Sequence, residues 1–317
     1  MNEIIRLFVN DENTNITHIY IPNCQIHLIP EAKRCFSEIE FLSCNTKTSD
    51  SVLTGLTDMC QSIKELELVI NVKNNNHEIA RSSKKLVSVS FLTSYDESAH
   101  DILFCEVLEN SLIKHANTIQ HFKITKQPTT QILSYLINLK SLELASDFYN
   151  EKWHRLENFS TPFLQILRAR RVSVKPLAGL IENTSGYLTE FNINNGGDST
   201  LNNRIIIQAI QAICKKCPNL KYLKLSLMST NILELEKLLI NCQYLEGLYI
   251  LKIDAIYWGN LFEILAKSSP NRHPMLLHFI QILQFDLEHK NLIEKYKEEG
   301  IVKSFAYNIF NEDFEWD

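Results

Sequence analysis

The stretch Cys217-Pro218-Asn219-Leu220-Lys221-Tyr222-Leu223-Lys224-Leu225 decides the fold class of this chain of 317 residues. It places a leucine at a position that we name n, here Leu220, and two more leucines at n+3 and n+5. Side chains alternate between the two faces of a β-strand, so the residues at n+3 and n+5 point to the same side. The stretch therefore predicts a short strand with one apolar face.

The same spacing of apolar residues recurs along the whole chain. From Ile16 to Val302 it advances in eleven steps with a mean length of 26 residues. That period lies within the range of about 20–29 residues for leucine-rich repeats, in which each unit adds one parallel strand to a growing sheet. The positions n are Ile16, Phe36, Ile63, Leu86, Ile119, Leu139, Leu164, Leu188, Leu220, Leu245, Leu277 and Val302. We therefore predict an α/β leucine-rich-repeat solenoid (a horseshoe), with parallel strands on its concave face and helices on its convex face.

The two ends of the chain depart from this repeat. We expect residues 1–15 to be an N-terminal cap or the stump of an upstream domain, and residues 16–317 to form the solenoid. Pro270 and Pro274 interrupt the pattern, so residues from about 268 to 317 are expected to form an irregular C-terminal cap. Phe310, Phe314 and Trp316 would cover the apolar face of the last repeat. The alternative is that this acidic and aromatic tail docks on a partner.

The composition limits the classes of function. Apolar residues make up 45% of the chain and charged residues 22%, a balance typical of soluble globular proteins. The net charge of −5 gives no reason to expect binding to nucleic acid or to an anionic membrane. The sequence lacks an apolar run of about 18 residues and the layout of a signal peptide. We expect a monomer in the cytoplasm or the nucleus.

The eight cysteines raise the question of a redox or metal site. Cys214 and Cys217 form a C-x-x-C pair at the end of a predicted helix, without a second pair or a histidine pair at zinc spacing. In several repeats a cysteine stands three residues before n, as do Cys60, Cys217 and Cys242. This position would close the preceding helix, where a compact apolar group fits. We interpret these cysteines as structural and expect neither a metal nor a cofactor.

Motifs of catalysis are missing from the sequence. The G-x-S-x-G elbow, the H-E-x-x-H helix, the phosphate loop and the G-x-G-x-x-G turn do not occur. Glycine is scarce, with 8 residues in all, which disfavours a backbone cradle for phosphate. We therefore predict that the protein is not an enzyme.

The predicted concave face offers a surface instead. Residues at n+2, n+4 and n+6 should point away from the apolar core. Arginine and tyrosine among them belong to the residue types that most often dominate binding. The candidate residues for binding a protein partner are Glu38, Glu40, Glu65, Glu67, His121, Lys123, Arg168, Arg170, Asn192, Tyr222, Lys224 and Tyr249.

The form Cys-x-x-Leu-x-x-Leu-x-Leu, seen at Cys217–Leu225 and nearly repeated at Cys242–Ile250, resembles the cysteine-containing repeats of F-box proteins. The stretches Ile29–Phe36 and Asn308–Trp316 are similar in sequence to F-box/leucine-rich-repeat proteins of filamentous and mycorrhizal fungi. The resemblance implies a non-catalytic substrate receptor of a Skp1–cullin–F-box (SCF) ubiquitin ligase, with the target held on the concave face. An F-box needs about forty residues, so the first fifteen cannot contain it, and Skp1 and cullin are expected partners only if an F-box lies upstream. The alternative is a standalone interaction scaffold without a ligase role.

Overall fold

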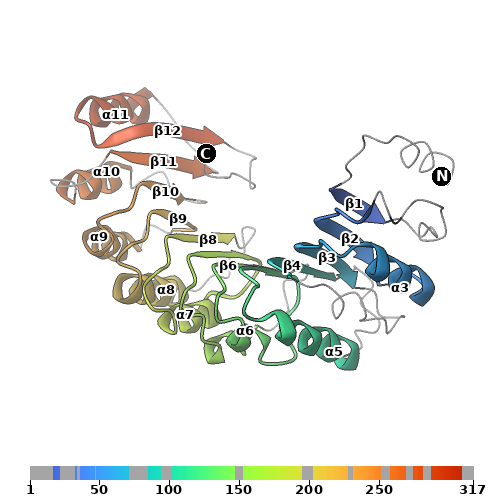
Figure 1. The fold of residues 1–317 in the computed structure, drawn as a ribbon. Coiled ribbons are helices and arrows are strands. Elements are labelled where there is room, and N and C mark those ends of the chain that lie inside the picture. Colours follow the sequence, from blue (N-terminus) through green and yellow to red (C-terminus); the bar gives the residue numbers. More distant parts are fainter. Residues whose placement is uncertain are drawn as a thin grey trace. The chain divides into compact units, whose positions relative to one another are not determined.

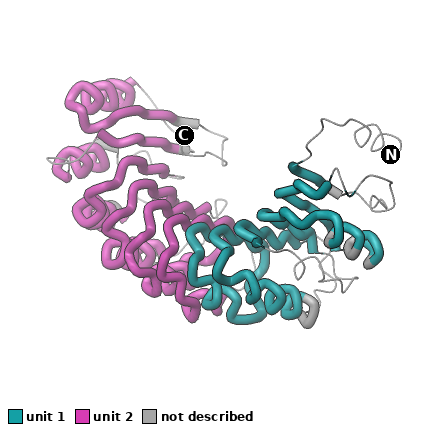
Figure 2. Tube along the Cα trace, in the orientation of Figure 1, with its two compact units in different colours: residues 1–143 teal, residues 144–317 magenta. Residues whose placement is uncertain are grey.

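The computed structural model describes residues 17–21, 33, 36–46, 48–70, 85–93, 102–146, 153–194, 203–227, 231–250, 258–268, 274–280 and 287–308. The predicted cap at residues 1–15 and the tail at 309–317 lie outside the described residues. The chain divides into two compact units, residues 1–143 and 144–317, which Figure 2 colours separately. Each unit is described by itself.

Unit 1 is a parallel sheet with helices on one side. Its strands β1 to β5 pair in chain order, each parallel to the next. Figure 1 shows α3 and α5 on the same side of these strands. The elements are β1 (His18–Ile21), β2 (Phe41–Asn45), α3 (Asp50–Met59), β3 (Glu65–Ile70), β4 (Ser88–Thr93), α5 (Ile102–Leu112), the 3₁₀ helix η2 (Ile113–His115), β5 (His121–Ile124) and α6 (Ile132–Tyr135). The strand β6 (Ser141–Ala145) contains the boundary between the units.

Unit 2 repeats the arrangement. The strands β7 to β12 are also parallel, and those paired run in chain order. Helices α7 to α10 lie along one side of them in Figure 1. The elements are η3 (Leu156–Asn158), β7 (Ile166–Arg170), α7 (Val174–Glu182), β8 (Glu190–Asn194), α8 (Asn203–Lys216), β9 (Tyr222–Leu225), α9 (Ile232–Asn241), β10 (Gly247–Ile250), α10 (Trp258–Lys267), β11 (Met275–Ile280), α11 (Leu287–Glu298) and β12 (Val302–Asn308).

The apolar residues at n+3 and n+5 form the core of each unit. In unit 1 the register aligns Leu66 with Val89 and then Phe122, and all three are buried. In unit 2 Leu223 is aligned with Leu248 and is fully buried. Burying such side chains contributes about 1.5–3 kcal/mol each. The predicted fold, an α/β leucine-rich-repeat solenoid of parallel strands and helices, is confirmed.

A recurrent backbone hydrogen bond marks the frame of the repeat. The carbonyl at n+1 accepts two N–H groups from the next repeat, as the Glu40 carbonyl does from Lys64 and Glu65 at 2.8 and 2.9 Å. The Thr189 carbonyl does the same for Lys221 and Tyr222 at 2.8 and 3.0 Å. Because one acceptor serves two donors, the entry to each strand is fixed by the strand before it.

This frame corrects the second repeat. Leu42 lies opposite Leu66 and Cys44 opposite Leu68, so n is Ile39 and not Phe36. Apolar residues at 36, 39, 41 and 42 are compatible with two frames, and the wrong one turned Phe41 toward the core. In the structure Phe41 instead pairs with Glu65, on the face opposite the helices.

The predicted repeat at Leu277 is also displaced by three residues, in the opposite direction. Leu248 lies opposite Leu277 and Ile250 opposite Phe279, so n is Pro274. A proline at n hid this frame in the sequence. The next strand, β12, retains the predicted positions, because Phe305 lies opposite Leu277.

The cysteines three residues before n close their helices as predicted. The N–H groups of Cys60, Cys217 and Cys242 each donate to the carbonyl four residues earlier at 2.8 Å, and the three side chains are buried. The Cys242 thiol also lies 3.6 Å from the Cys217 carbonyl, which links successive repeats. Burial raises the pKa of the Cys217 thiol to about 12, and the neighbouring Cys242 and Cys214 thiols act in the same direction.

Candidate functional site

Apart from Glu38 and Glu40, the candidate residues lie on strands, and they are on the sheet face opposite the helices, which we name the strand-side surface. Parallel pairing without a shift aligns equal repeat positions, so residues at n+2 form one row and residues at n+4 form another. Each unit carries its own strand-side surface, and the side chains on the two surfaces differ in kind.

In unit 1 the rows bring an aromatic cluster next to two carboxylates. The Phe41 ring stacks on His18 with centroids 5.5 Å apart and lies 5.2 Å from the Tyr20 ring. Tyr20 is 69% exposed. Glu65 lies directly opposite Phe41 on the next strand, and Glu67 accepts a hydrogen bond of 2.7 Å from the Ser43 hydroxyl. We name the group His18, Tyr20, Phe41, Glu65 and Glu67 the aromatic–acidic face.

The sequence located only part of this face. Glu65 and Glu67 lie on β3 and point to the strand side, as predicted. The placement of Glu38 and Glu40 on a strand was wrong: both precede β2, and Glu40 forms an ion pair with Lys64 at the strand entry. The error follows from the misplaced frame, which also concealed Phe41.

His121 and Lys123 lie on β5 in the predicted rows, opposite Ser88 and Ser90. The Lys123 ammonium pairs with the Glu143 carboxylate at 2.6 Å, and both side chains are more than a third exposed. Pairs of this kind contribute little to stability, so both groups remain available for a ligand.

In unit 2 the row at n+4 begins with a charged pair and ends in a stack. Arg168 lies opposite Asn192. The Arg168 guanidinium donates to the Glu190 carboxylate at 2.8 Å, which holds the arginine along the sheet. Arg170, at the end of β7, is exposed as predicted.

A second interaction joins Tyr222, at n+2 on β9, to Glu246, the residue before β10. The Tyr222 hydroxyl donates to the Glu246 carboxylate at 3.1 Å, and the same carboxylate pairs with Lys221 at 2.9 Å. Burial and this hydrogen bond raise the pKa of Tyr222. Tyr222, a candidate predicted from the sequence, is half-buried on the strand side. Glu246 was not among the candidates predicted from the sequence.

Lys224, Tyr249 and His278 form a stack across β9, β10 and β11, opposite one another in the register. The Lys224 ammonium lies 4.4 Å from the centre of the Tyr249 ring, and the Tyr249 and His278 rings are stacked 4.4 Å apart. Burial, with the Lys224 charge as a second cause, lowers the pKa of His278. We name these three residues the cationic stack.

The predicted exposure of this stack was wrong. Lys224 is 2% exposed, Tyr249 is fully buried and His278 is 7% exposed. The alternation of the strand placed Lys224 and Tyr249 on the correct face, but the sequence could not show that these side chains are buried there. His278 was missed because the frame of its repeat was displaced.

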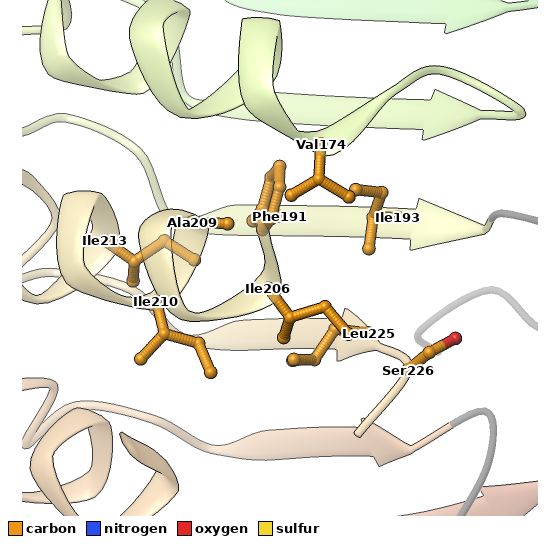
Figure 3. Close-up of a pocket in the computed structure, with 9 residues that line it drawn as sticks. All are labelled: Val174, Phe191, Ile193, Ile206, Ala209, Ile210, Ile213, Leu225 and Ser226. Carbon is orange, nitrogen blue, oxygen red and sulfur yellow. The ribbon is translucent and has the colours of Figure 1, made fainter. Parts of the chain in front are cut away.

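One hollow of unit 2 is apolar. An apolar pocket lies between α8 and the strands β8 and β9 (Figure 3), and its volume, including its open mouth, is about 340 Å³. Ile206, Ile210 and Ile213 of α8 line it with Phe191 and Leu225, and Ser226 supplies its polar group. Across the residues that the structure describes, no group of three or more His, Cys, Asp or Glu could hold a metal ion. None of the described helices is both long and apolar enough to cross a membrane.

No protein-family model matches the sequence, and a search of curated proteins finds no match. Among solved structures the chain is similar to the leucine-rich repeat-containing protein LegL7 from Legionella pneumophila. The two sequences are 12% identical, the alignment covers 93% of this chain and 94% of LegL7, and the TM-score is 0.47.

Proposed function

We propose that the chain is a non-catalytic protein-binding module, and that the aromatic–acidic face of unit 1 holds a basic segment of the target. Leucine-rich-repeat folds are typically binding scaffolds, because their stacked strands present aligned rows of side chains. The observation that supports this site is the exposed Tyr20 ring, in contact with Phe41 and one strand away from the Ser43–Glu67 hydrogen bond.

The charge of this region favours a cationic target. Residues 36–70 contain six acidic residues and two lysines, and one of these lysines, Lys64, is paired with Glu40. An arginine side chain can form two hydrogen bonds with a carboxylate and can also stack on an aromatic ring. Glu65 and the Phe41 ring, which are opposite each other on adjacent strands, match both requirements.

We further propose that the target is a substrate of an SCF-type ubiquitin ligase, for which this chain is the receptor. The support is the cysteine-type repeat, in which Cys60, Cys217 and Cys242 close the helices α3, α8 and α9 with the same 2.8 Å hydrogen bond. A standalone scaffold uses the same surface but recruits no ligase. Cytoplasmic or nuclear localisation and a monomeric state belong to this proposal.

The test is affinity purification from a lysate of the native organism with the wild-type chain and a double variant, Glu65→Lys/Glu67→Lys. A second double variant, Asp58→Lys/Glu106→Lys, makes the same change in charge at exposed positions of α3 and α5 on the helix side. We expect at least a tenfold loss of the captured target with the first variant and no loss with the second. Equal capture by all three proteins would exclude the aromatic–acidic face as the binding site.

The ligase role has its own readout in the same experiment. The chain is also expressed together with any coding sequence that precedes it in its gene. Recovery of Skp1 and a cullin with the longer protein supports the receptor role. Recovery of a target without Skp1 or a cullin from both lengths supports the standalone scaffold.

A further inference from the structure

Three aromatic side chains of unit 2 lie in a row at position n−1, where each repeat turns into its strand. Phe163, Tyr187 and Tyr244 are 46, 50 and 64% exposed. The Phe163 and Tyr187 rings are in contact, with centroids 5.7 Å apart. Asn219 has the same position in the repeat between those of Tyr187 and Tyr244. We name these four residues the entry edge.

Hydrogen bonds hold the entry edge in the frame of the repeat. In three repeats of unit 2 the N–H at n donates to the carbonyl at n−3, at 3.2 or 3.3 Å, which gives residue n−1 the same turn in each. The Asn219 side-chain amide donates to the Gly186 carbonyl at 3.4 Å. Gly186 has a φ of +85°, and a Cβ there would lie 3.3 Å from the Lys216 carbonyl. The end of α8 therefore packs against the backbone that carries Tyr187.

We propose that the entry edge binds a proline-containing segment of a partner protein in the polyproline II conformation, with an acidic residue between its prolines. Tyr187 precedes β8 and Tyr244 precedes β10, so their positions are two strand spacings, about 9.5 Å, apart. A polyproline II helix has three residues per turn and advances about 9.3 Å per turn. Prolines at i and i+3 therefore lie on one side of the ligand at the spacing of the two tyrosines. Exposed aromatic rings are the side chains on which proline-rich segments dock.

The repeat between the two tyrosines supplies polar and charged groups. The Asn219 amide has a second N–H, which can donate to a carbonyl of the ligand because polyproline II has no internal hydrogen bonds. Lys215 and Lys216 end α8, and neither forms an ion pair with a residue that the structure describes. Lys221, in contrast, is paired with Glu246. The two ammonium groups at the end of α8 complement an acidic residue of the ligand.

Fluorescence anisotropy on the full-length chain tests the proposal, with a labelled peptide in which Pro-Pro-Glu is repeated three times. We expect saturable binding to the wild type and at least a tenfold rise in Kd for Tyr187→Ala/Tyr244→Ala. Tyr187→Phe/Tyr244→Phe keeps both rings and should bind within twofold of the wild type. Tyr135→Ala, at an exposed tyrosine of α6 in unit 1, is the matched control and should leave Kd unchanged.

Two further comparisons separate charge from conformation. Lys215→Gln/Lys216→Gln should raise Kd at least fivefold, whereas Lys175→Gln, at an exposed lysine of α7, should not change it. A peptide of equal charge with a flexible backbone, Gly-Ser-Glu repeated three times, should bind at least tenfold more weakly than the proline peptide.

The inference concerns unit 2 and does not depend on the target of unit 1. Glu65→Lys/Glu67→Lys should therefore leave the Kd of the proline peptide unchanged. Absence of saturable binding to the wild type, equal binding of the two peptides, or a Kd that the alanine variant leaves unchanged would overturn the proposal.

Discussion

The Lys224 ammonium lies 4.4 Å above the centre of the Tyr249 ring, within a stack that is almost inaccessible to water. Cation–π contacts contribute about 0.5–1 kcal/mol at exposed sites and about 2 kcal/mol when they are desolvated. Strand alternation places Lys224 on the sheet face opposite the helices, yet its side chain is packed in the interior of unit 2.

Replacing Lys224 with alanine should therefore lower the free energy of unfolding by about 1–2 kcal/mol, from the lost ring contact and the lost packing of the aliphatic stem. Lys175→Ala, at an exposed position of α7, should change it by less than about 0.5 kcal/mol. Urea denaturation monitored by circular dichroism measures both values. Equal costs for the two lysines would mean that Lys224 is exposed in solution.

Leu223→Ala should cost about 2–5 kcal/mol, because the side chain is fully buried between the sheet and its helices. Leu233 in α9 is 63% exposed and provides a control of the same chemistry. Leu233→Ala should cost less than about 0.5 kcal/mol. If the two substitutions destabilise the chain to the same extent in urea titrations, the assignment of the core face of β9 is wrong.

Glu109→Gln should destabilise unit 1 by about 1–3 kcal/mol. The buried carboxylate accepts hydrogen bonds from the Thr129 and Thr130 N–H groups at 2.9 and 2.7 Å, and from the Thr130 hydroxyl at 2.6 Å. The amide of glutamine has one acceptor oxygen in place of two. Glu106→Gln, at an exposed position of the same helix, is the control, and thermal unfolding followed by circular dichroism is the measurement.

Cys44, Cys60 and Cys217 should resist alkylation in the folded chain. Burial raises the pKa of each thiol to about 12. At pH 8 about one thiol in 10⁴ is ionised, against about one in four for an unperturbed cysteine. Mass spectrometry after a short treatment with iodoacetamide should find these three unmodified without denaturant and modified in urea. Rapid alkylation of Cys217 without denaturant would contradict the burial of its thiol at the end of α8.

The stability of unit 2 should fall as the pH is lowered toward 5. The lowered pKa of His278 in the folded state means that the unfolded chain binds this proton more readily. The contribution of His278 to the free energy of unfolding is fully present above its pKa of about 6.5 in the unfolded chain. This contribution is lost as the pH falls through the lower pKa that His278 has in the folded chain. Lys224 and Tyr249 are the stack partners of this ring. We expect His278→Gln to reduce the difference in unfolding midpoint between pH 7.5 and 5.5; an unchanged difference would assign the pH dependence to other groups.

The period of the repeat was enough to predict the fold, whereas the frame of individual repeats was not. Phe36, Ile39, Phe41 and Leu42 satisfy the pattern in two ways, and only the pairing of Leu42 with Leu66 separates them. The error removed Phe41 from the candidate surface and placed Glu38 and Glu40 on it.

The strand-side candidates of unit 2 show a second limit. Alternation assigned Arg168, Tyr222 and Lys224 to the correct face, because it depends only on backbone geometry. Whether such a residue meets water depends on what lies above the sheet, which neighbouring positions in the sequence do not encode. The half-exposed Arg168 and the buried Lys224 have the same position in the repeat and different surroundings.

The carbonyl at n+1 that accepts two N–H groups, seen at Glu40 and Thr189, also constrains how genes for such chains can change in length. An insertion between one strand and the next leaves the accepting carbonyl of each strand in place. The spacing of 33 residues from Leu86 to Ile119 is an example of such a long connection. An insertion of one residue between n and n+5 would rotate an apolar side chain to the opposite face. Mutation can therefore lengthen the helical returns freely and can add or delete whole repeats, while the short strand segments tolerate substitution alone.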